Sequence, residues 1–308
     1  MRHAILGPGG VGGLIAASLA YSGEAVTVIV RSDTAALYPD VIQLESSFGR
    51  FTVAVEHSST VPAVDILWIA VKAIELEQAL GSIPDSTAIA AILPLLNGID
   101  HVALLRARCG SSRVIPATIT VESERASRGH IVHRSPFARL NISAAGSPLL
   151  DSTINKLREL GFTCNFVDDE QTLLWSKLVF LAPLALATTA ANKTTGEIAQ
   201  DQALRRQLQD SVREACAVAQ SEGAIVSPES VLSSINALPP GTRSSMQKDV
   251  DRGKLPELDA IAGPILRGAI RHHLQVPVIR KLQAEVEHRS RESLTKSSSH
   301  GSGDGQCD

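Results

Sequence analysis

Apolar residues recur along the chain with two different periods, and the pattern changes near residue 168. Before that point, short apolar runs that predict strands alternate with stretches whose apolar positions recur every three or four residues, as in amphipathic helices. We expect strands at 3–6, 25–30, 41–45, 50–55, 65–71, 87–93, 114–121, 130–133, 139–143 and 162–167. We expect helices at 11–22, from 73, from 100 and at 149–160. This alternation predicts an α/β fold with a parallel, doubly wound sheet.

Beyond residue 168 the pattern predicts helices alone. Asp168 and Asp169 are suited to cap the first of them, and helical periods continue at 201–222, 228–236, 255–273 and 276–293. The last twelve residues are rich in serine and glycine, which predicts disorder. We therefore expect an α/β domain at 1–168, an all-α domain at 169–296 and a disordered tail at 297–308.

The composition is that of a globular protein with an aliphatic core. Hydrophobic residues make up 44% of the chain, charged residues 20% and aromatic residues 3%, which excludes general disorder. The net charge is −3 and no basic block is present, so nucleic acid is not an expected partner.

The four cysteines, Cys109, Cys164, Cys216 and Cys307, have no metal-binding spacing. We interpret them as free thiols of a reducing cytoplasm, and expect no metal.

The segment Leu173–Ala190 is strongly apolar but contains one charge, Lys177. The uncharged run that follows, 178–191, is shorter than the roughly 20 residues that span a membrane. We therefore expect a buried helix and no membrane association. Lys177 is then either a side chain that reaches solvent along the helix or a group with a chemical role.

A glycine-rich motif, GPGGVG, follows the first expected strand and precedes the first expected helix. It matches the G-x-G-x-x-G pattern of Rossmann-type dinucleotide-binding units, in which the helix N-terminus faces the pyrophosphate. The expected cofactor-binding residues are Gly7, Pro8, Gly9, Gly10, Val11 and Gly12.

The residues after the strands expected at 25–30 and 65–71 favour NADP(H) over NAD(H). Arg31 stands where an enzyme for NAD carries an acidic residue for the ribose hydroxyls. A guanidinium there can bind a 2′-phosphate in a bidentate manner, and Ser32 can add a hydroxyl donor. Lys72 ends the strand expected at 65–71 and is either a further phosphate contact or a solvated strand end.

Three further polar residues are noted as candidates, although each also has a purely structural interpretation. Asn97 follows a strand and precedes Gly98, so it can hold the nicotinamide or a substrate oxygen, or simply form a turn. Ser245 and Glu257 lie in an unusually polar segment, 243–263, of the helical half. Taken alone, they are a turn serine and a surface glutamate.

Short motifs in a fixed order make the chain resemble the ketopantoate reductases (2-dehydropantoate 2-reductases). They are G-P-G-G-V-G at 7–12, V-K at 71–72, L-N-G at 96–98, W-S-K-L at 175–178, T-G-E at 195–197, S-S-M-x-x-D at 244–249 and E-L-D at 257–259. The resemblance extends over nearly the whole chain except the tail. It implies reduction of the 2-keto group of ketopantoate with NADPH, a step of pantothenate and coenzyme A synthesis.

The resemblance also implies a role for each candidate residue. Lys177 resembles the catalytic lysine, and Glu257 the glutamate that supports the lysine or the substrate. Asn97 resembles the asparagine beside nicotinamide and substrate, and Ser245 the serine that binds the substrate carboxylate. Arg31 and Lys72 resemble the family's 2′-phosphate contacts.

Three positions depart from the family pattern. Leu181 and Ala185, one and two turns after Lys177 on the same helix face, stand where the family usually has asparagines. Thr195 stands at the position of a third family asparagine and is a candidate substrate contact. The apolar side chains of Leu181 and Ala185 would lower the pKa of Lys177. Reduction of a different, more apolar 2-keto acid, or non-catalytic NADP(H) binding, therefore remain alternatives. The long helix can also carry a homodimer contact.

Overall fold

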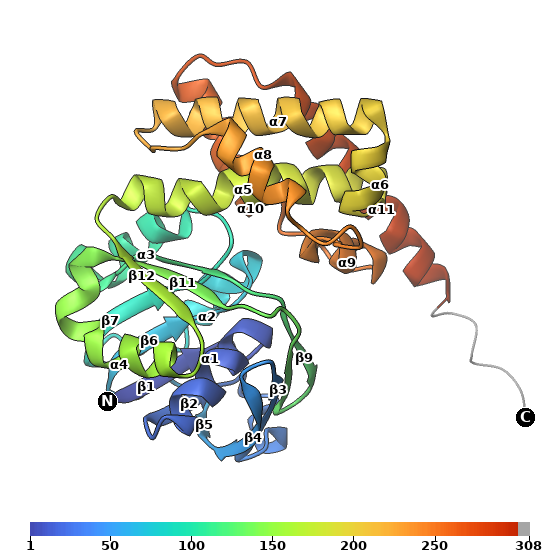
Figure 1. Cartoon of the computed structure of the whole chain (residues 1–308). Helices are drawn as coiled ribbons and strands as arrows, with labels where there is room; N and C mark the ends of the chain where they lie inside the picture. The colour runs from blue at the N-terminus through green and yellow to red at the C-terminus, as the bar shows by residue number, and fades with distance from the viewer. Residues whose placement is uncertain (301–308) are drawn as a thin grey trace, which may run out of the picture. The chain divides into compact units, whose positions relative to one another are not determined.

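The first part of the chain forms three β-sheets in a computed structural model of the protein (Figure 1). The structure describes residues 1–300, with side chains up to residue 295. The strands are β1 (Arg2–Leu6), β2 (Ala25–Ile29), β3 (Val41–Ser46), β4 (Gly49–Ala54), β5 (Glu56–Ser58), β6 (Val64–Ile69), β7 (Ile89–Pro94), β8 (Ala117–Thr120), β9 (Ser123–Ser127), β10 (His130–His133), β11 (Arg139–Ser143) and β12 (Thr163–Val167).

The five-stranded sheet has the parallel arrangement that the sequence predicts. Its order is β5-β2-β1-β6-β7, and every neighbouring pair is parallel. The chain goes from β1 to β2 on one side and later to β6 on the other, so the strand order reverses at β1. Ligands of open α/β sheets bind beyond the carboxyl ends of the strands at such a reversal. The fold class expected from the sequence is thus confirmed for this sheet.

The other two sheets are mixed, which the sequence pattern does not predict. One has the order β4-β3-β10-β9 and the other the order β12-β11-β8. The expected β3–β4 hairpin is present, but β3 also pairs in parallel with β10, where Gln43 lies opposite His130. β5 and β9 were not expected, because one has three residues and the other, Ser-Glu-Arg-Ala-Ser, has no apolar alternation.

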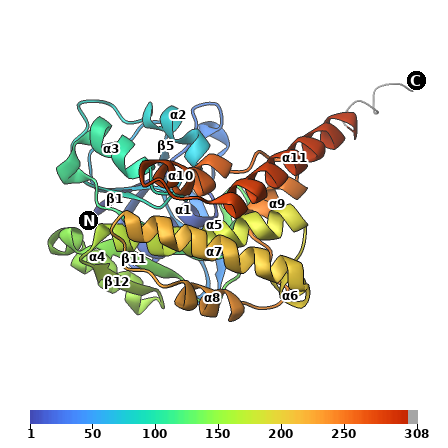
Figure 2. The ribbon, with the colours of Figure 1, turned by 90° about the horizontal axis from the view of Figure 1, so that it is seen from above.

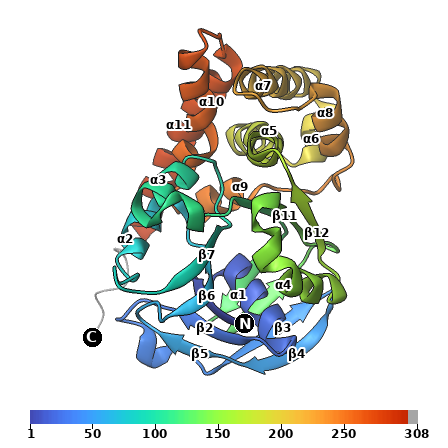
Figure 3. The ribbon, with the colours of Figure 1, turned by 90° about the vertical axis from the view of Figure 1, so that its left-hand side faces the viewer.

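The helices of this part are α1 (Gly10–Tyr21), α2 (Leu76–Leu80), α3 (His101–Cys109) and α4 (Ser147–Glu159), with short 3-10 turns η1 (Ala35–Leu37), η2 (Ala73–Glu75), η3 (Ser111–Arg113) and η4 (Ala144–Gly146). α1 contacts β1 and β2 as well as β3, β4, β9 and β10, so it packs between two sheets (Figure 3). Residues 12–19 are consequently all buried. Gly13 permits this packing, because a Cβ there would lie 2.3 Å from the Cδ1 atom of Ile131.

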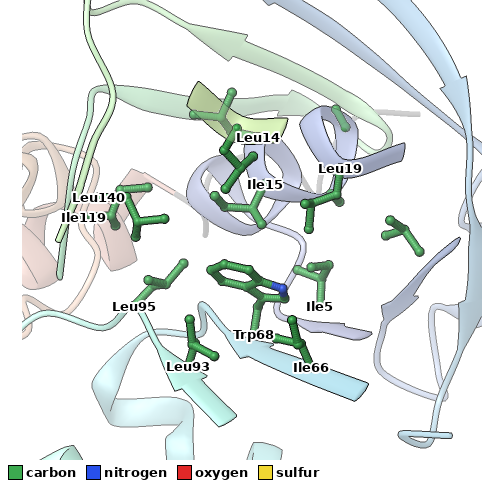
Figure 4. Close-up of a cluster of buried hydrophobic side chains, with 14 of the residues drawn as sticks. Ile5, Leu14, Ile15, Leu19, Ile66, Trp68, Leu93, Leu95, Ile119 and Leu140 are labelled. Carbon is green, nitrogen blue, oxygen red and sulfur yellow. The ribbon is translucent and has the colours of Figure 1, made fainter. Parts of the chain in front are cut away.

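The core beneath α1 is aliphatic apart from one indole. Trp68 of β6 lies among Ile5, Leu14, Ile15 and Leu93 and is fully buried (Figure 4). Its indole nitrogen donates a hydrogen bond to Nδ1 of buried His3, 3.2 Å away. This core fixes β1 and α1, and with them the loop that joins them.

The second part of the chain contains helices and no strands among its described residues. Its elements are α5 (Glu170–Ala191), α6 (Thr195–Gln200), α7 (Gln202–Ser221), α8 (Pro228–Asn236), α9 (Ser245–Asp251), α10 (Leu258–Arg271) and α11 (Pro277–His300). α7 packs against α6, α8, α10 and α11 (Figure 2). The chain divides into two units between Leu174 and Trp175, within α5.

Side-chain caps explain where several of these helices begin. Asp169, one of the two expected caps of α5, accepts hydrogen bonds from the backbone N–H groups of Gln171 (3.3 Å) and Thr172 (2.9 Å). Thr194 and Glu197 form a reciprocal capping box at α6, which gives the acidic residue of the T-G-E motif a structural role. α6 and α9 are short polar helices that the apolar period did not predict.

The end of the chain differs in part from the expected tail. α11 continues through Ser297 to His300, so the first four residues of the expected disordered segment are helical. Extending a formed helix costs less than nucleating one, even through serines. The rest of that segment, 301–308, lies outside the described residues, as does Cys307. Cys109, Cys164 and Cys216 are free thiols.

Among the described helices, α5 is long and apolar enough to cross a membrane by length and composition. Most of the apolar stretch of this helix is, however, buried inside the protein. A core helix of a globular protein has these properties, which agrees with the buried helix expected from the sequence.

Candidate functional site

The glycine loop lies at the carboxyl end of β1 and needs its glycines for steric reasons. Gly7 has φ of +92°, and a Cβ there would lie 2.7 Å from a methyl carbon of Val71. A Cβ on Gly12 would lie 2.3 Å from the carbonyl oxygen of Gly7. The tight turn and the close approach of helix to loop that the motif predicts are therefore both present.

The start of α1 is open to an anionic group. Its N-cap residue is Gly9, which offers no side-chain cap, and nothing lies within 4 Å of a Cβ placed there. Backbone N–H groups in the first turn of a helix have no intrahelical acceptor and, with the helix dipole, favour phosphate. The loop therefore fits the pyrophosphate of a dinucleotide. Pro8 and Val11 complete it, the former buried and the latter half-buried.

β9 supports the loop from the neighbouring sheet, which the sequence did not indicate. The Ser123 hydroxyl donates a hydrogen bond to the carbonyl oxygen of Gly10, 2.8 Å away. A Cβ on Gly10 would lie 2.1 Å from the Ser123 carbonyl oxygen. Gly10 is thus required by this strand, although the motif alone leaves its position unspecified.

The other residues expected at the cofactor follow parallel strands of the same sheet. Arg31 and Ser32 follow β2 and are exposed, while Lys72 follows β6 and Asn97 follows β7, both half-buried. The carbonyl of Arg31 accepts hydrogen bonds from the backbone N–H (3.0 Å) and hydroxyl (3.1 Å) of Thr34, which form the turn after β2. Because these strands are parallel, the structure brings all four residues to the edge that carries the glycine loop.

In the helical unit, Lys177 is a half-buried cation within apolar α5. Burial lowers its pKa to about 8, and the negative charge of Glu257 acts in the opposite direction. Glu257 occupies the N-cap position of α10 and is half-buried. The two residues expected to be catalytic therefore interact electrostatically, and the lowered pKa agrees with the expectation from the sequence.

The helix face beyond Lys177 is aliphatic. Leu181 is half-buried and Ala185 is fully buried. These side chains lie one and two turns along the helix and offer no hydrogen-bonding group.

The serine pair that begins α9 has one exposed and one buried member. Ser245, the candidate carboxylate ligand, is the first helical residue and is exposed. Ser244 is buried, caps α9 by accepting from the N–H of Gln247 (3.1 Å), and accepts a hydrogen bond from the hydroxyl of Thr188 in α5 (2.9 Å). Nothing in the sequence indicated a role for Thr188, because only its contact with Ser244 distinguishes it from other threonines in helices.

Thr195, the remaining candidate substrate contact, already uses its hydroxyl proton. The hydroxyl donates to the carbonyl of Pro239 at 2.8 Å and lies 3.2 Å from that of Pro240. A hydroxyl has one proton and two lone pairs, so towards a substrate this group can act as an acceptor.

No group of three histidine, cysteine, aspartate or glutamate residues suited to a metal ion occurs in the part of the chain that the structure describes.

Comparison with family models matches both parts of the chain. Residues 3–146 match the model for ketopantoate reductase PanE/ApbA, and residues 169–290 match the model for its C-terminal domain. A 2-dehydropantoate 2-reductase from Caulobacter vibrioides is 30% identical over 286 residues, which is 89% of this chain and 94% of that protein.

Solved structures show the same fold. A PanE/ApbA family ketopantoate reductase from Ralstonia eutropha JMP134 superimposes with a TM-score of 0.83 at 25% identity, covering 95% of this chain and 99% of that one. A D-mandelate dehydrogenase in complex with NADH and anilino(oxo)acetate also has a TM-score of 0.83, covering 95% of this chain and 99% of its own, but is only 18% identical. The second likeness concerns the fold alone.

Proposed function

Because the chain belongs to the ketopantoate reductase PanE/ApbA family, we propose that it reduces the 2-keto group of 2-dehydropantoate to pantoate with NADPH. The family membership makes it an oxidoreductase that acts on CH–OH groups. In this proposal it serves pantothenate and coenzyme A biosynthesis in the cytoplasm, as a monomer or a homodimer.

The observation that carries the proposal is the burial and protonation of Lys177. A ketone that accepts a hydride develops negative charge on its oxygen and needs a proton donor there. Lys177 is a half-buried ammonium whose pKa of about 8 lies near neutral pH, where a general acid is most effective. Glu257 favours the charged form, so the proton is present in the resting enzyme.

NADPH, when bound, supplies the hydride. The glycine loop is proposed to hold its pyrophosphate, with the open N-terminus of α1 directed at the phosphates. The exposed guanidinium of Arg31, with Ser32 and Lys72, is proposed to bind the 2′-phosphate. Asn97 is proposed to orient the nicotinamide and a substrate oxygen.

Two residues of the helical unit are proposed to bind the substrate, and a third is proposed to support Lys177. The exposed hydroxyl of Ser245 donates to the substrate carboxylate. Thr195 accepts a hydrogen bond from a substrate hydroxyl, because its own proton is held by the carbonyl of Pro239. Glu257 holds Lys177 in its charged state.

The test is the oxidation of NADPH and NADH in the presence of ketopantoate and a series of 2-keto acids of differing size and polarity. We expect turnover with NADPH and a preference over NADH that falls in an Arg31→Ala variant. Binding of NADPH without oxidation by any of the acids would favour the non-catalytic alternative instead.

A second candidate substrate is favoured by the aliphatic face of α5. A substrate hydroxyl that meets half-buried Leu181 has no partner there and loses its hydrogen bonds to water. A 2-keto acid with a wholly apolar side chain avoids this cost. The matched pair is ketopantoate and its analogue without the hydroxyl, 3,3-dimethyl-2-oxobutanoate.

A Leu181→Asn variant is expected to shift selectivity towards ketopantoate. One recovered hydrogen bond corresponds to about 1–2 kcal/mol, or roughly tenfold in the ratio of kcat/KM for the two acids. Leu255→Asn is the control, because Leu255 is an exposed leucine of the same unit. An unchanged ratio in Leu181→Asn would mean that this side chain does not face the substrate.

A further inference from the structure

α9 is a short helix whose position depends on contacts with its neighbours. It has seven residues, too few to be stable alone. At its N-terminal end, Ser244 receives the hydrogen bond from Thr188 of α5, and Gln247 donates to the side chain of Asn192, 3.3 Å away. At its C-terminal end it packs against α11 (Figure 2).

Arg289 of α11 connects the C-terminal ends of α5 and α9. Nη1 of its guanidinium donates to the backbone carbonyl of Thr189, in the last turn of α5. Nη2 donates to Oδ1 of Asp251 at 2.6 Å. The Arg289 side chain is only 19% exposed and that of Asp251 27%. Asp251 also pairs with Arg243, which precedes α9.

This arrangement suits an arginine and not another cation. A positive charge is favourable at the end of α5, where carbonyl groups lack helical partners. The planar guanidinium can bind a carbonyl on one helix and a carboxylate on another at once, whereas an ammonium is a point charge on a flexible stem. Asp251 is itself at a helix C-terminus, which is unfavourable for a carboxylate unless cations offset it.

We propose that Arg289 is a positioning residue for the reaction: by tying α9 to the end of α5, it fixes Ser245 relative to Lys177. This inference rests on the proposed function, in which α9 carries the carboxylate ligand and α5 the general acid. If α9 moves, Ser245 binds the substrate carboxylate less well, which raises KM. The keto group then also lies away from its position at Lys177, and a displacement of about 1 Å can lower the rate by up to about a hundredfold. Arg289 acts through α9 and is not itself a ligand of substrate or cofactor.

The test compares Arg289→Met and Arg289→Lys with Arg291→Met, which alters an exposed arginine two residues along the same helix. For the best 2-keto acid substrate of the wild-type protein, we expect KM to rise about tenfold or more in Arg289→Met. The rise is smaller in Arg289→Lys and absent in Arg291→Met. The Kd for NADPH stays within about twofold in all three, since the cofactor residues lie in the other unit.

Hydrogen exchange provides a readout independent of turnover. Amides of Ser245–Asp251 are expected to exchange faster in Arg289→Met than in Arg291→Met, while those of α7 are unchanged. If the wild-type protein reduces no 2-keto acid, the proposed function fails, and exchange in α9 alone decides whether Arg289 holds this helix. A KM within about twofold of wild type together with unchanged exchange would overturn the inference. Arg289→Lys serves both measurements if Arg289→Met does not fold.

Discussion

Replacing Lys177 with methionine is expected to lower kcat for 2-keto acid reduction by about two to four orders of magnitude, the usual contribution of a general acid. Methionine keeps the length and apolar stem of the side chain, so the packing of α5 is retained. The Kd for NADPH is expected to stay unchanged. Lys281→Met is the control, because Lys281 is an exposed lysine of α11.

The pH dependence of the wild-type enzyme provides a second readout of the same group. The pKa of Lys177 is about 8, and the protonated form is the proton donor, so kcat/KM should fall as the pH rises above about 8. The Lys177→Met variant should lack this decline. A kcat within threefold of wild type, or the same decline in the variant, would show that Lys177 is not the acid.

The same substitution should stabilise the fold at neutral pH. The pKa of Lys177 is about 8 in the folded protein and 10.5 ordinarily, so unfolding takes up a proton between these values. The cost of burying the charge is therefore fully present below pH 8 and is lost as the pH rises to 10.5. Allowing for partial exposure, Lys177→Met should gain about 2 kcal/mol in unfolding free energy at pH 7 and little above pH 10.5.

Alanine substitutions in the glycine loop are expected to separate cofactor affinity from stability. Gly9→Ala places a methyl group where nothing lies within 4 Å, at an ordinary φ of −80°, so the fold should be unaffected. The methyl group nevertheless occupies the space open to the pyrophosphate, and the affinity for NADPH should fall at least about tenfold. Calorimetric titration and thermal unfolding measure the two effects.

Two further glycines complete this comparison. Gly12→Ala brings a Cβ within 2.3 Å of the Gly7 carbonyl and should reduce both affinity and stability, the latter by about 1–3 kcal/mol. Gly23→Ala is the control: its φ of +79° makes alanine cost about 1 kcal/mol, yet it lies at the opposite end of α1. If Gly9→Ala binds NADPH as tightly as wild type does, the loop does not hold the pyrophosphate.

Features encoded by local pattern could be predicted from the sequence. The glycine loop, the Asp169 cap and strands such as β10 depend on residues within a few positions of each other. The cofactor edge could also be anticipated, because parallel strands place residues that follow them, such as Arg31 and Lys72, at one side of a sheet.

Features that depend on long-range pairing could not be predicted in this way. The mixed sheets arise from pairs such as β3 with β10, and polar β9 is a strand because β10 is its partner. For the same reason Ser123 and Thr188 carried no recognisable signal. Their importance comes from contacts with Gly10 and Ser244, distant in the chain.

In the proposed reaction, a hydride passes from NADPH to the keto carbon of a 2-keto acid, and Lys177 donates the proton. The most direct test is to supply ketopantoate and NADPH that carries deuterium at the transferred position, and to analyse the product by mass spectrometry. We expect the wild-type protein to form pantoate with deuterium on its hydroxyl-bearing C2, and Lys177→Met to form almost none. If the wild-type protein gives no deuterated product with either ketopantoate or 3,3-dimethyl-2-oxobutanoate, it does not catalyse this reaction.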